Sequence, residues 1–562
     1  MLTRIELKFG SAQEQPPLAL ELPPSVTIFV GANNSGKSLL LREIHRFCRE
    51  GDASGNSILG RLMFAADDAE VAHTDIERLS LPPFPGEQLS AGMFLCENSR
   101  HGRTRLSREQ YIAARTQPNA HPRNAASWHV DGWTLSLDGA ERVRLLQPQA
   151  RGDLTNPKLP LARLYVSDAK RTNLRRIVHN AIGLHIGIDA FSADQVQIHF
   201  GDTPPVDERS YNDAALDWVR SARKLDQVSD GVKAFTGIML QVYAGDPKII
   251  IVDEPEAFLH PSLSHQLGRE LASAAVRERK HIFAATHSAQ FVMGAIQSGA
   301  SVNIVRLAYD GVEGTARLLS SVDLSRLMMD PLLRSVGVIN ALFFQNVIVT
   351  EADADRAFYE EINHRLIVAG DARGISHALF LNADGKATIP KIVEPLRKLG
   401  IPTAAIVDVD LVKDGGEVYT RHLRASFYPS DQLDASQNHR LKVLASLEKA
   451  APEGENPREY FKRHGGLSLL SEQELESAEN FCDALAQYGY FIVKIGEVER
   501  WLPALDVPRK KQGSQSWRAT IFGAMGSDPN DDAYVKPSSG DVWDFVGNIG
   551  SWCRATRRGI PV

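Results

Sequence analysis

The chain has 562 residues, which is too long for one hydrophobic core, so at least two domains are expected. Its composition, 43% hydrophobic and 23% charged, is that of a globular protein, and a formal net charge of −6 excludes a general electrostatic attraction to nucleic acid. The four cysteines form no C-x-x-C pair, and no apolar run approaches the ~20 residues of a membrane span. We therefore expect a cytosolic protein with no zinc ribbon, no disulfide framework and no membrane partner.

A phosphate-binding loop is predicted at residues 31–38. Its sequence fits the pattern G-x-x-x-x-G-K-[ST] and lies between a β-branched run, residues 25–30, and an apolar stretch with helical spacing, residues 39–44. Glycines let backbone N–H groups turn towards an anion, and the helix N-terminus adds partial positive charge. Lys37 is expected to reach the β- and γ-phosphates of ATP, and Ser38 to bind Mg²⁺. The predicted nucleotide-binding residues here are Gly31, Asn33, Asn34, Ser35, Gly36, Lys37 and Ser38.

Residues 50–160 mix Gly, Pro, Arg and Asp with short apolar runs, and we interpret them as an insertion within the first domain. Within and just after this stretch, short strands are predicted at residues 134–137, 143–146 and 163–167. Further along, Ser229 is a good N-cap for a helix that begins near Val232, and Gly231 permits a close backbone approach. Alone, this is a common helix start.

Two predicted strands end in polar residues that suit ATP hydrolysis. The predicted strand that starts at Lys248 continues as the apolar run 249–252, typical of a central parallel strand, and leads into Asp253 and Glu254. Because ligands bind at the carboxyl ends of strands in open α/β sheets, Asp253 is expected to face the Mg²⁺ and Glu254 to polarise an attacking water. The strand at 281–286 ends at His287, which is placed to sense a γ-phosphate. A lone histidine is usually structural, but the position of His287 after the phosphate loop and after the strand that ends in Asp253 favours a functional role.

Four motifs occur in one order: the phosphate loop and residues 229–231, 251–256 and 286–288. This order resembles ATP-binding-cassette (ABC) ATPases, and residues 254–261 resemble their chromosome-maintenance and recombination branch. In such enzymes two subunits sandwich ATP, and the signature loop of one caps the γ-phosphate on the other. The resemblance implies that Ser229 and Gly231 bind nucleotide in trans, in a homodimer or higher homo-oligomer formed through the ATPase domains. Asp230 departs from the common pattern, which has Gly there.

A second α/β pattern follows the ATPase segment, which is expected to end near residue 318 with a helical connector at 319–342. A strand at 346–350 delivers Glu351, and Asp355 lies about one helical turn further on. A later strand, 403–407, ends in Asp408-x-Asp410. Carboxylates clustered at one sheet edge are costly unless a divalent metal neutralises them. The residues alone leave a plainer interpretation equally open, in which these are ordinary acidic strand ends and helix caps.

The spacing Glu351-x-x-x-Asp355 followed by Asp408-x-Asp410 resembles the Toprim domain of topoisomerases, primases and related nucleases. There the Glu serves acid–base chemistry or metal binding, and the Asp pair binds Mg²⁺. Ala352 stands where that pattern usually has Gly. An ABC-type ATPase fused to a C-terminal Toprim domain is the arrangement of the OLD (overcoming lysogenisation defect) family of ATP-dependent nucleases, and the likeness covers almost the whole chain.

The expected fold is α/β throughout. It comprises an ABC-type P-loop ATPase domain at residues 1–318 and a Toprim domain, a Rossmann-like parallel sheet, at residues 343–562 with a helical insertion at 411–480. The family resemblance also implies a third acidic element, which Glu497 and Glu499 fit because they follow an apolar strand. The expected metal ligands are Ser38 and Asp253 in the ATPase domain, and Glu351, Asp355, Asp408, Asp410, Glu497 and Glu499 in the Toprim domain.

The Toprim carboxylates are enough for two Mg²⁺ or Mn²⁺ ions about 4 Å apart, which can activate a water and stabilise the leaving oxygen in phosphodiester hydrolysis. Members of the family also use a downstream lysine, for which Lys536 is the first choice and Lys511 the second. The expected catalytic residues are thus Glu254, His287, Glu351 and Lys536.

The leading hypothesis is an ATP-dependent or ATP-regulated, metal-dependent DNA endonuclease or nickase. The resemblance suggests defence against phage or other foreign DNA and admits an accessory defence subunit. The alternative is an ATP-binding sensor or scaffold whose Toprim domain is weakly active and recruits or restrains a partner. A topoisomerase-like strand passer would need a tyrosine nucleophile on a separate breakage domain, and the sequence shows no such domain.

Overall fold

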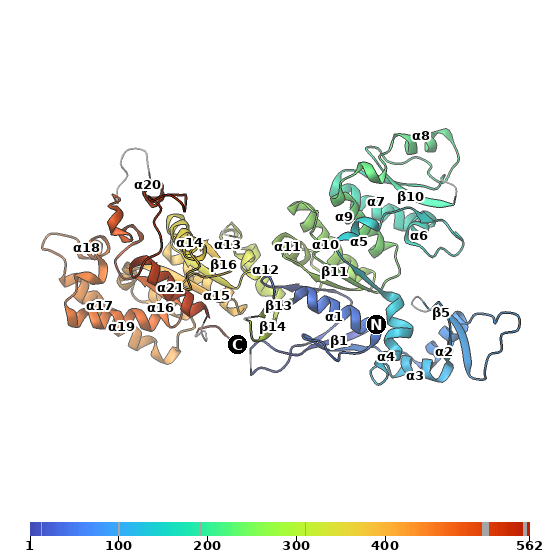
Figure 1. Cartoon of the computed structure of the whole chain (residues 1–562), viewed down its shortest axis with the longest axis horizontal. Helices are drawn as coiled ribbons and strands as arrows, with labels where there is room; N and C mark the ends of the chain where they lie inside the picture. Colours follow the sequence, from blue (N-terminus) through green and yellow to red (C-terminus); the bar gives the residue numbers. More distant parts are fainter. Residues whose placement is uncertain are drawn as a thin grey trace. The chain divides into compact units, whose positions relative to one another are not determined.

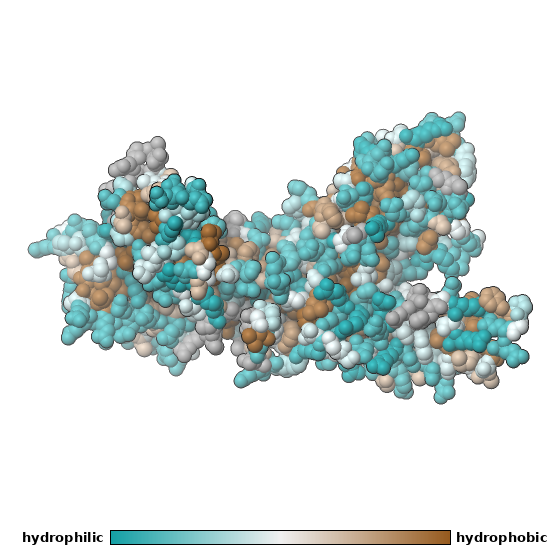
Figure 2. All heavy atoms as spheres, in the orientation of Figure 1, coloured by the Kyte–Doolittle hydropathy of each residue, from teal (hydrophilic) through white to brown (hydrophobic). Residues whose placement is uncertain are grey.

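The computed structural model describes residues 1–12, 14–98, 102–191, 194–309, 311–335, 337–508, 516–554 and 559–561. The chain folds into two compact units, Met1–Ser325 and Arg326–Val562, whose elements are labelled in Figure 1. Hydrophilic residues cover most of the face seen in Figure 2. Over the described part of the chain, no helix has both the length and the apolar character needed to cross a membrane.

The first unit is organised around a six-stranded sheet of order β14-β13-β3-β12-β11-β7, in which every pair except β13 with β14 is parallel. Its central strands are buried almost throughout, as their apolar sequences predict. The carboxyl ends of β3, β11 and β12 meet at one edge. The strands are β3 (Val26–Val30), β7 (Thr134–Leu137), β11 (Ile249–Asp253), β12 (His281–Ala285), β13 (Val302–Tyr309) and β14 (Gly314–Leu319).

Helices and three smaller sheets complete the described part of the first unit (Figure 1). Helix α1 (Lys37–Glu50) follows the phosphate loop and shares a core with the central sheet and with the antiparallel sheet β2-β1-β4. A third sheet has the order β8-β10-β9. Further elements of this unit are β1 (Leu2–Leu7), β2 (Ala19–Glu21), β4 (Leu59–Phe64), β8 (Gln149–Ala150), β9 (His185–Asp189), β10 (Gln195–Gly201), α9 (Asp230–Tyr243), α10 (Pro261–Arg277) and α11 (Ala289–Gln297).

Residues 50–160 contribute to several parts of this unit. Strand β4 pairs with β1, and β7 pairs with β11 in the central sheet. Between them, α2 (Ala69–Leu79), β5 (Met93–Asn98), β6 (Gly102–Ser107) and α3 (Arg108–Thr116) enclose a small core of their own. The strand predicted at 134–137 is therefore present as β7. The strands predicted at 143–146 and 163–167 are wrong, because those residues lie at or after the end of α5 (Gly139–Arg144) and in α6 (Pro160–Val166).

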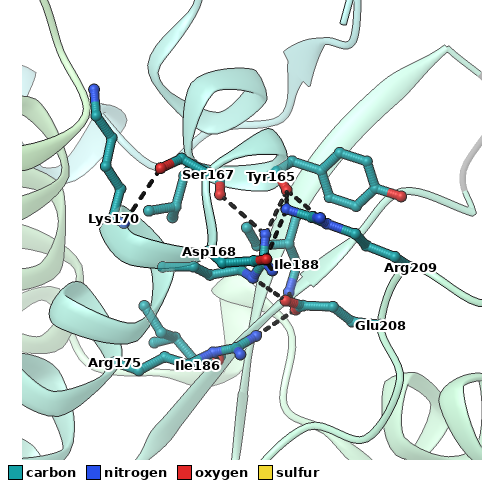
Figure 3. A network of polar contacts seen from close by, with 11 residues as sticks. Tyr165, Ser167, Asp168, Lys170, Arg175, Ile186, Ile188, Glu208 and Arg209 are labelled. Atoms are coloured by element: carbon teal, nitrogen blue, oxygen red, sulfur yellow. Dashed lines mark hydrogen bonds and ion pairs between the residues drawn. The ribbon is translucent and has the colours of Figure 1, made fainter.

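A buried polar network fixes the segment between α6 and α8 (Asp213–Ser221) (Figure 3). The carboxylate of Glu208 accepts the backbone N–H of Ile188 at 2.9 Å and pairs with Arg171 and Arg175, both at 2.5 Å. The two arginines lie on α7 (Asp168–Ile182), so the network joins this helix to β9 and to the loop after β10. These basic side chains are neutralised within the unit.

The second unit contains a four-stranded parallel sheet of order β16-β15-β17-β18. A core of apolar side chains from these strands and from α14 and α21 holds it together. Because all four strands are parallel, Glu351 after β15 and Asp408 at the end of β17 reach the same edge. The strands are β15 (Asn346–Thr350), β16 (Ala378–Asn382), β17 (Thr403–Asp408) and β18 (Tyr490–Val493).

Helices connect these strands and lead into the unit. Between β17 and β18 the chain forms four α-helices, α16 (Glu417–Ala425), α17 (Leu433–Lys449), α18 (Pro457–His464) and α19 (Glu472–Ala486). The connector region carries α12 (Ser321–Met329), α13 (Pro331–Ser335) and the 3-10 helix η4 (Val338–Phe343). The other helices are α14 (Asp353–Val368), α15 (Ile389–Lys398), α20 (Trp517–Met525) and α21 (Asp541–Arg554).

Candidate functional site

The loop between β3 and α1 folds tightly around the ammonium group of Lys37. Asn34 and Gly36 have positive φ angles of 62° and 91°, and a Cβ at Gly31 would lie 2.1 Å from the carbonyl oxygen of Leu307. The Nζ of Lys37 donates to the carbonyl oxygens of Gly31 at 2.9 Å and Ala32 at 2.8 Å. Burial lowers the pKa of Lys37 to about 8, although neighbouring carboxylates oppose this shift.

Three further predicted residues lie near Lys37. The carboxylates that oppose the lowering of the Lys37 pKa include those of Asp253 and Glu254. Burial lowers the pKa of His287, and the nearby Lys37 ammonium lowers it further. The Oδ1 atom of Asp253 is buried and has no hydrogen-bond partner among the described residues. A carboxylate oxygen of this kind fits a divalent cation, since Mg²⁺ takes oxygen ligands. Ser38 is half-buried in the first turn of α1, and Asn33 is exposed.

Glu256 is a residue of this edge that the sequence analysis did not select. Its carboxylate accepts the Thr286 hydroxyl at 2.8 Å and the backbone N–H of His287 at 2.7 Å. Burial raises the pKa of Glu256. The residue thus joins the end of β11 to the end of β12 and fixes the backbone of His287. Its sequence signal was present, because Glu256 lies in the same acidic run as Asp253.

The signature residues lie at the start of α9. Ser229 caps the helix, and its Oγ accepts the Val232 N–H at 3.4 Å. A Cβ at Gly231 would lie 2.6 Å from the carbonyl oxygen of Phe258, so the glycine allows α9 to approach the segment after β11. The carboxylate of Asp230 pairs with Lys233 at 2.9 Å. The charge that departs from the common pattern is therefore compensated one turn along the helix.

In the second unit, carboxylates from two strand ends meet. Glu351, Asp408 and Asp410, here called the acidic cluster, each offer an oxygen atom, and these atoms lie within 4.8 Å of one another. Glu351 also accepts the Asp408 backbone N–H at 3.0 Å. Burial and then the charge of Asp408 raise the pKa of Glu351, and burial raises that of Asp408. An all-carboxylate donor set at this spacing fits Mg²⁺ or Mn²⁺.

Three other predicted ligands lie around this cluster. Burial and the charge of Asp408 raise the pKa of Asp355 to about 7 and also raise the pKa of Glu499, so both carboxylates lie near Asp408. Glu497 is buried, and the preceding Gly496 accepts the backbone N–H of Val409 at 3.1 Å. The loop after β18 is thereby held next to the end of β17.

Three lysines surround the acidic cluster, and none of them was predicted from the sequence as a catalytic lysine. Lys462 lies 2.8 Å from Asp408, Lys386 lies 2.7 Å from Asp410, and Lys413 lies 3.1 Å from Asp410. Although burial opposes the shift, Lys386 and Lys462 lower the pKa of Asp410 to about 2. Lys386 follows β16 in a strand-end loop, which was a usable signal. Lys462 lies on α18, within residues 411–480, where no motif marks it.

The lysine chosen first from the sequence makes no described contact with the acidic cluster. Lys536 is exposed, and no hydrogen bond or ion pair between it and the acidic cluster is present in the described part of the chain. Its neighbour Val535 accepts a hydrogen bond from Arg365 at 2.9 Å. Lys511 lies outside the described residues. The cations that do reach the cluster come from the β16–α15 loop, from the end of β17 and from α18.

Fold and sites together define a class of protein: an ABC-type P-loop ATPase joined in one chain to a Toprim domain with a carboxylate cluster at its sheet edge. The family comparisons agree with this organisation. Residues 155–293 match the family described as "AAA domain, putative AbiEii toxin, Type IV TA system", and residues 342–410 match "Overcoming lysogenization defect protein-like, TOPRIM domain". The predicted fold class is confirmed.

A curated relative aligns with most of the chain. The "OLD nuclease" of Thermus scotoductus (strain ATCC 700910 / SA-01) is 22% identical over 517 residues, which cover 80% of this chain and 89% of the relative. The resemblance to the OLD family that the motif order predicted is therefore confirmed by an OLD-like Toprim match and by a relative that spans most of the chain.

Solved structures with similarity to this chain each cover a little more than half of it. An SMC head bound to the C-winged helix domain of ScpA is 12% identical, covers 58% of this chain and 99% of its own, and has a TM-score of 0.35. The SMC head domain from Thermotoga maritima is 14% identical, covers 57% of this chain and 98% of its own, and has a TM-score of 0.29.

Proposed function

We propose that this protein is an ATP-regulated, metal-dependent DNA endonuclease or nickase. One observation carries the proposal: Glu351, Asp408 and Asp410 present oxygen atoms within 4.8 Å of one another at a partly buried sheet edge. Burial, with the repulsion between these carboxylates added to it, raises the pKa of Glu351 and Asp408, as expected for carboxylates arranged for a cation. The name of the OLD nuclease relative supports the same activity.

The acidic cluster would hold Mg²⁺ or Mn²⁺, with Asp355, Glu497 and Glu499 as additional ligands. Two bound ions would supply an activated water and stabilise the leaving oxygen of a phosphodiester. Asp408 is the better placed of the two strand-end aspartates, because Asp410 is engaged by three lysines. We assign the charge-stabilising lysine to Lys462 instead of Lys536, since its Nζ lies 2.8 Å from Asp408. A cation there can bind a non-bridging phosphate oxygen.

The ATP site is proposed at the other sheet edge. Lys37 and Ser38 would bind the phosphates and the Mg²⁺, and the free buried oxygen of Asp253 supports a role in holding that ion. Glu254 would polarise the attacking water and His287 would sense the γ-phosphate. Ser229 and Gly231 of a second copy would complete the site, which makes a homodimer the smallest active assembly. By analogy with the family, the biological role is defence against phage or other foreign DNA.

The test is a plasmid assay with Mg²⁺ or Mn²⁺, with and without ATP. We expect chelator-sensitive nicking that Asp408→Ala abolishes while ATP hydrolysis continues, and Lys37→Ala should remove ATP binding. Asp434→Ala, which changes an exposed aspartate of α17, is the matched control and should cut normally. Cleavage at the wild-type rate by the Asp408→Ala variant would refute the site.

The alternative, a sensor or scaffold with a weakly active Toprim domain, also has an observation in its favour. Lys386, Lys413 and Lys462 compensate part of the acidic charge from within the chain. This reduces the demand for an ion. Calorimetric titration of the whole protein with Mn²⁺ separates the two: binding that Asp408→Ala removes supports the nuclease, and absence of binding together with absence of nicking supports the scaffold.

A further inference from the structure

A fully buried arginine lies against the backbone of the proposed catalytic glutamate. Arg142 is on α5, which follows β7, the neighbour of β11 in the central sheet. Only 1% of its surface is exposed. Its Nη1 donates to the carbonyl oxygen of Glu254, and its Nε donates to the carbonyl oxygen of Asp138 at 3.1 Å. Arg142 thus connects the edge of the sheet to the end of β11.

The backbone of Glu254 needs such support. Its φ angle is +50°, a left-handed conformation that residues other than glycine seldom adopt. The Glu254 N–H donates to Ala285 at 2.8 Å, and its carbonyl oxygen accepts the Ala257 N–H at 2.9 Å in addition to Arg142. Over the residues that the structure describes, every hydrogen bond found for Glu254 involves its main chain. The direction of its exposed side chain is therefore set through the backbone.

The same arginine lies next to the signature helix. Gly237 is in the middle of α9, and a Cβ at this position would lie 2.8 Å from the Cβ of Leu145 and 3.1 Å from the carbonyl oxygen of Arg142. The end of α5 therefore packs directly on α9, which begins after Ser229. A movement of α9 would therefore displace Arg142 and, through its hydrogen bond, the backbone of Glu254.

We infer that Arg142 is a positioning residue for ATP hydrolysis, which holds the Glu254 peptide in its left-handed conformation and couples that conformation to α9. The inference rests on the proposed ATPase function. Arg142 contacts the main chain of Glu254 and is not among the residues proposed to bind nucleotide. Its loss should therefore impair turnover and leave nucleotide affinity intact.

The test compares Arg142→Met and Arg142→Lys with the wild-type protein. For Arg142→Met we expect a kcat roughly 10- to 100-fold lower, because a small misplacement of a catalytic group is enough for such a loss. The Kd for ATP, measured by calorimetry on the whole protein, should change less than about twofold. Arg142→Lys keeps one donor and should recover part of the rate. An unchanged kcat in both variants would overturn the inference.

A double-mutant comparison separates positioning from a general loss of stability. Residual turnover of Glu254→Gln is measured with enzyme in excess over radiolabelled ATP, alone and combined with Arg142→Met. If Arg142 acts through Glu254, the second change should cost almost nothing in this background. If Arg142→Met lowers turnover by the same factor in the wild-type and Glu254→Gln backgrounds, its role is purely structural and the inference is overturned.

Arg171→Met is the matched control, since Arg171 is also a buried arginine of the first unit and pairs with Glu208. It should lower the melting temperature and leave kcat near wild type. The failures of the two proposals are distinguishable. If the wild-type protein does not hydrolyse ATP, the proposed function fails; if it does, Glu254→Gln stops it and Arg142→Met does not slow it, only the positioning role fails.

Discussion

Asp410 and Asp355 both lie near Asp408, yet their pKa values shift in opposite directions. Burial raises the pKa of Asp355 to about 7, and the charge of Asp408 adds to that shift. Asp410 is also buried, but Lys386 and Lys462 lower its pKa to about 2. The lysines therefore act unequally: they outweigh burial at Asp410, whereas burial and the charge of Asp408 outweigh Lys462 at Asp355. A divalent ion would gain most near Asp355, where the carboxylate charge is least compensated.

This division predicts how stability depends on pH without a divalent ion. Between the ordinary value of 3.8 and about 7, folded Asp355 keeps a proton that the unfolded chain has lost. The unfolded state then binds fewer protons, so stability should fall as pH rises through this window, by at most ~1.4 kcal/mol per pH unit. Thermal unfolding at several pH values measures the slope. Asp355→Asn should flatten it and Mg²⁺ should offset it; equal slopes with and without the substitution would contradict the assignment.

A second prediction at this scale concerns the lysines. Lys462→Met should lower the rate of plasmid cleavage roughly 100-fold, because a preorganised cation beside the metal ligands is lost. The matched control is Lys536→Met, which removes an exposed lysine and should retain near wild-type cleavage. Nicking rates at saturating Mg²⁺ decide between them. The reverse result would return the role to Lys536.

At the scale of elements, α18 is locked onto the loop after β18. A Cβ at Gly496 would lie 2.3 Å from the carbonyl oxygen of Lys462, and one at Gly466 would lie 2.3 Å from that of Lys494. Both glycines have positive φ angles. In addition, Leu467 donates to the Lys494 carbonyl oxygen at 2.8 Å. The helix that carries Lys462 is thus held against the segment that carries Glu497 and Glu499.

Gly496→Ala should break this packing. We expect a loss of about 1–3 kcal/mol in the free energy of unfolding of the second unit, from backbone strain and overpacking. Cleavage should fall as well, because Lys462 shifts away from Asp408. Gly523→Ala is the control, since a Cβ there meets no atom within 4 Å and its helical position favours alanine. Urea titration followed by circular dichroism compares the two; equal stability for both variants would show that the packing tolerates the change.

At the scale of the whole molecule, a nucleotide site and a carboxylate cluster share one chain but lie in separate compact units. Neither unit needs the other to complete its sheet, since each sheet is formed within its own unit. We therefore expect ATP binding to influence the proposed cleavage through the assembly of subunits or through a change in the position of one unit against the other. Assembly is the simpler route under the proposal that Ser229 and Gly231 of a second copy complete the ATP site.

Mixing two inactive variants tests this assembly. Lys37→Ala lacks a functional phosphate loop, and Ser229→Arg blocks the exposed signature position, so each alone should hydrolyse no ATP. In an equal mixture, half of the dimers are mixed and each contains one intact composite site. Activity should return to about a quarter of the wild-type value for a twofold-symmetric dimer. No recovery after co-refolding or subunit exchange would indicate that each chain completes its own site.

Local patterns were enough to predict the fold class and the resemblance to the OLD family. The phosphate loop, the acidic strand ends at Asp253 and Glu351 and the Asp408-x-Asp410 pair are such patterns, and parallel strands bring their carboxyl ends to one edge of each sheet. Contacts between distant segments could not be predicted in this way. Arg142 reaches Glu254 across 112 positions, and Lys386 and Lys462 reach Asp410 across 24 and 52. No local signal marks such pairs, because packing, and not the neighbouring sequence, sets which side chains meet.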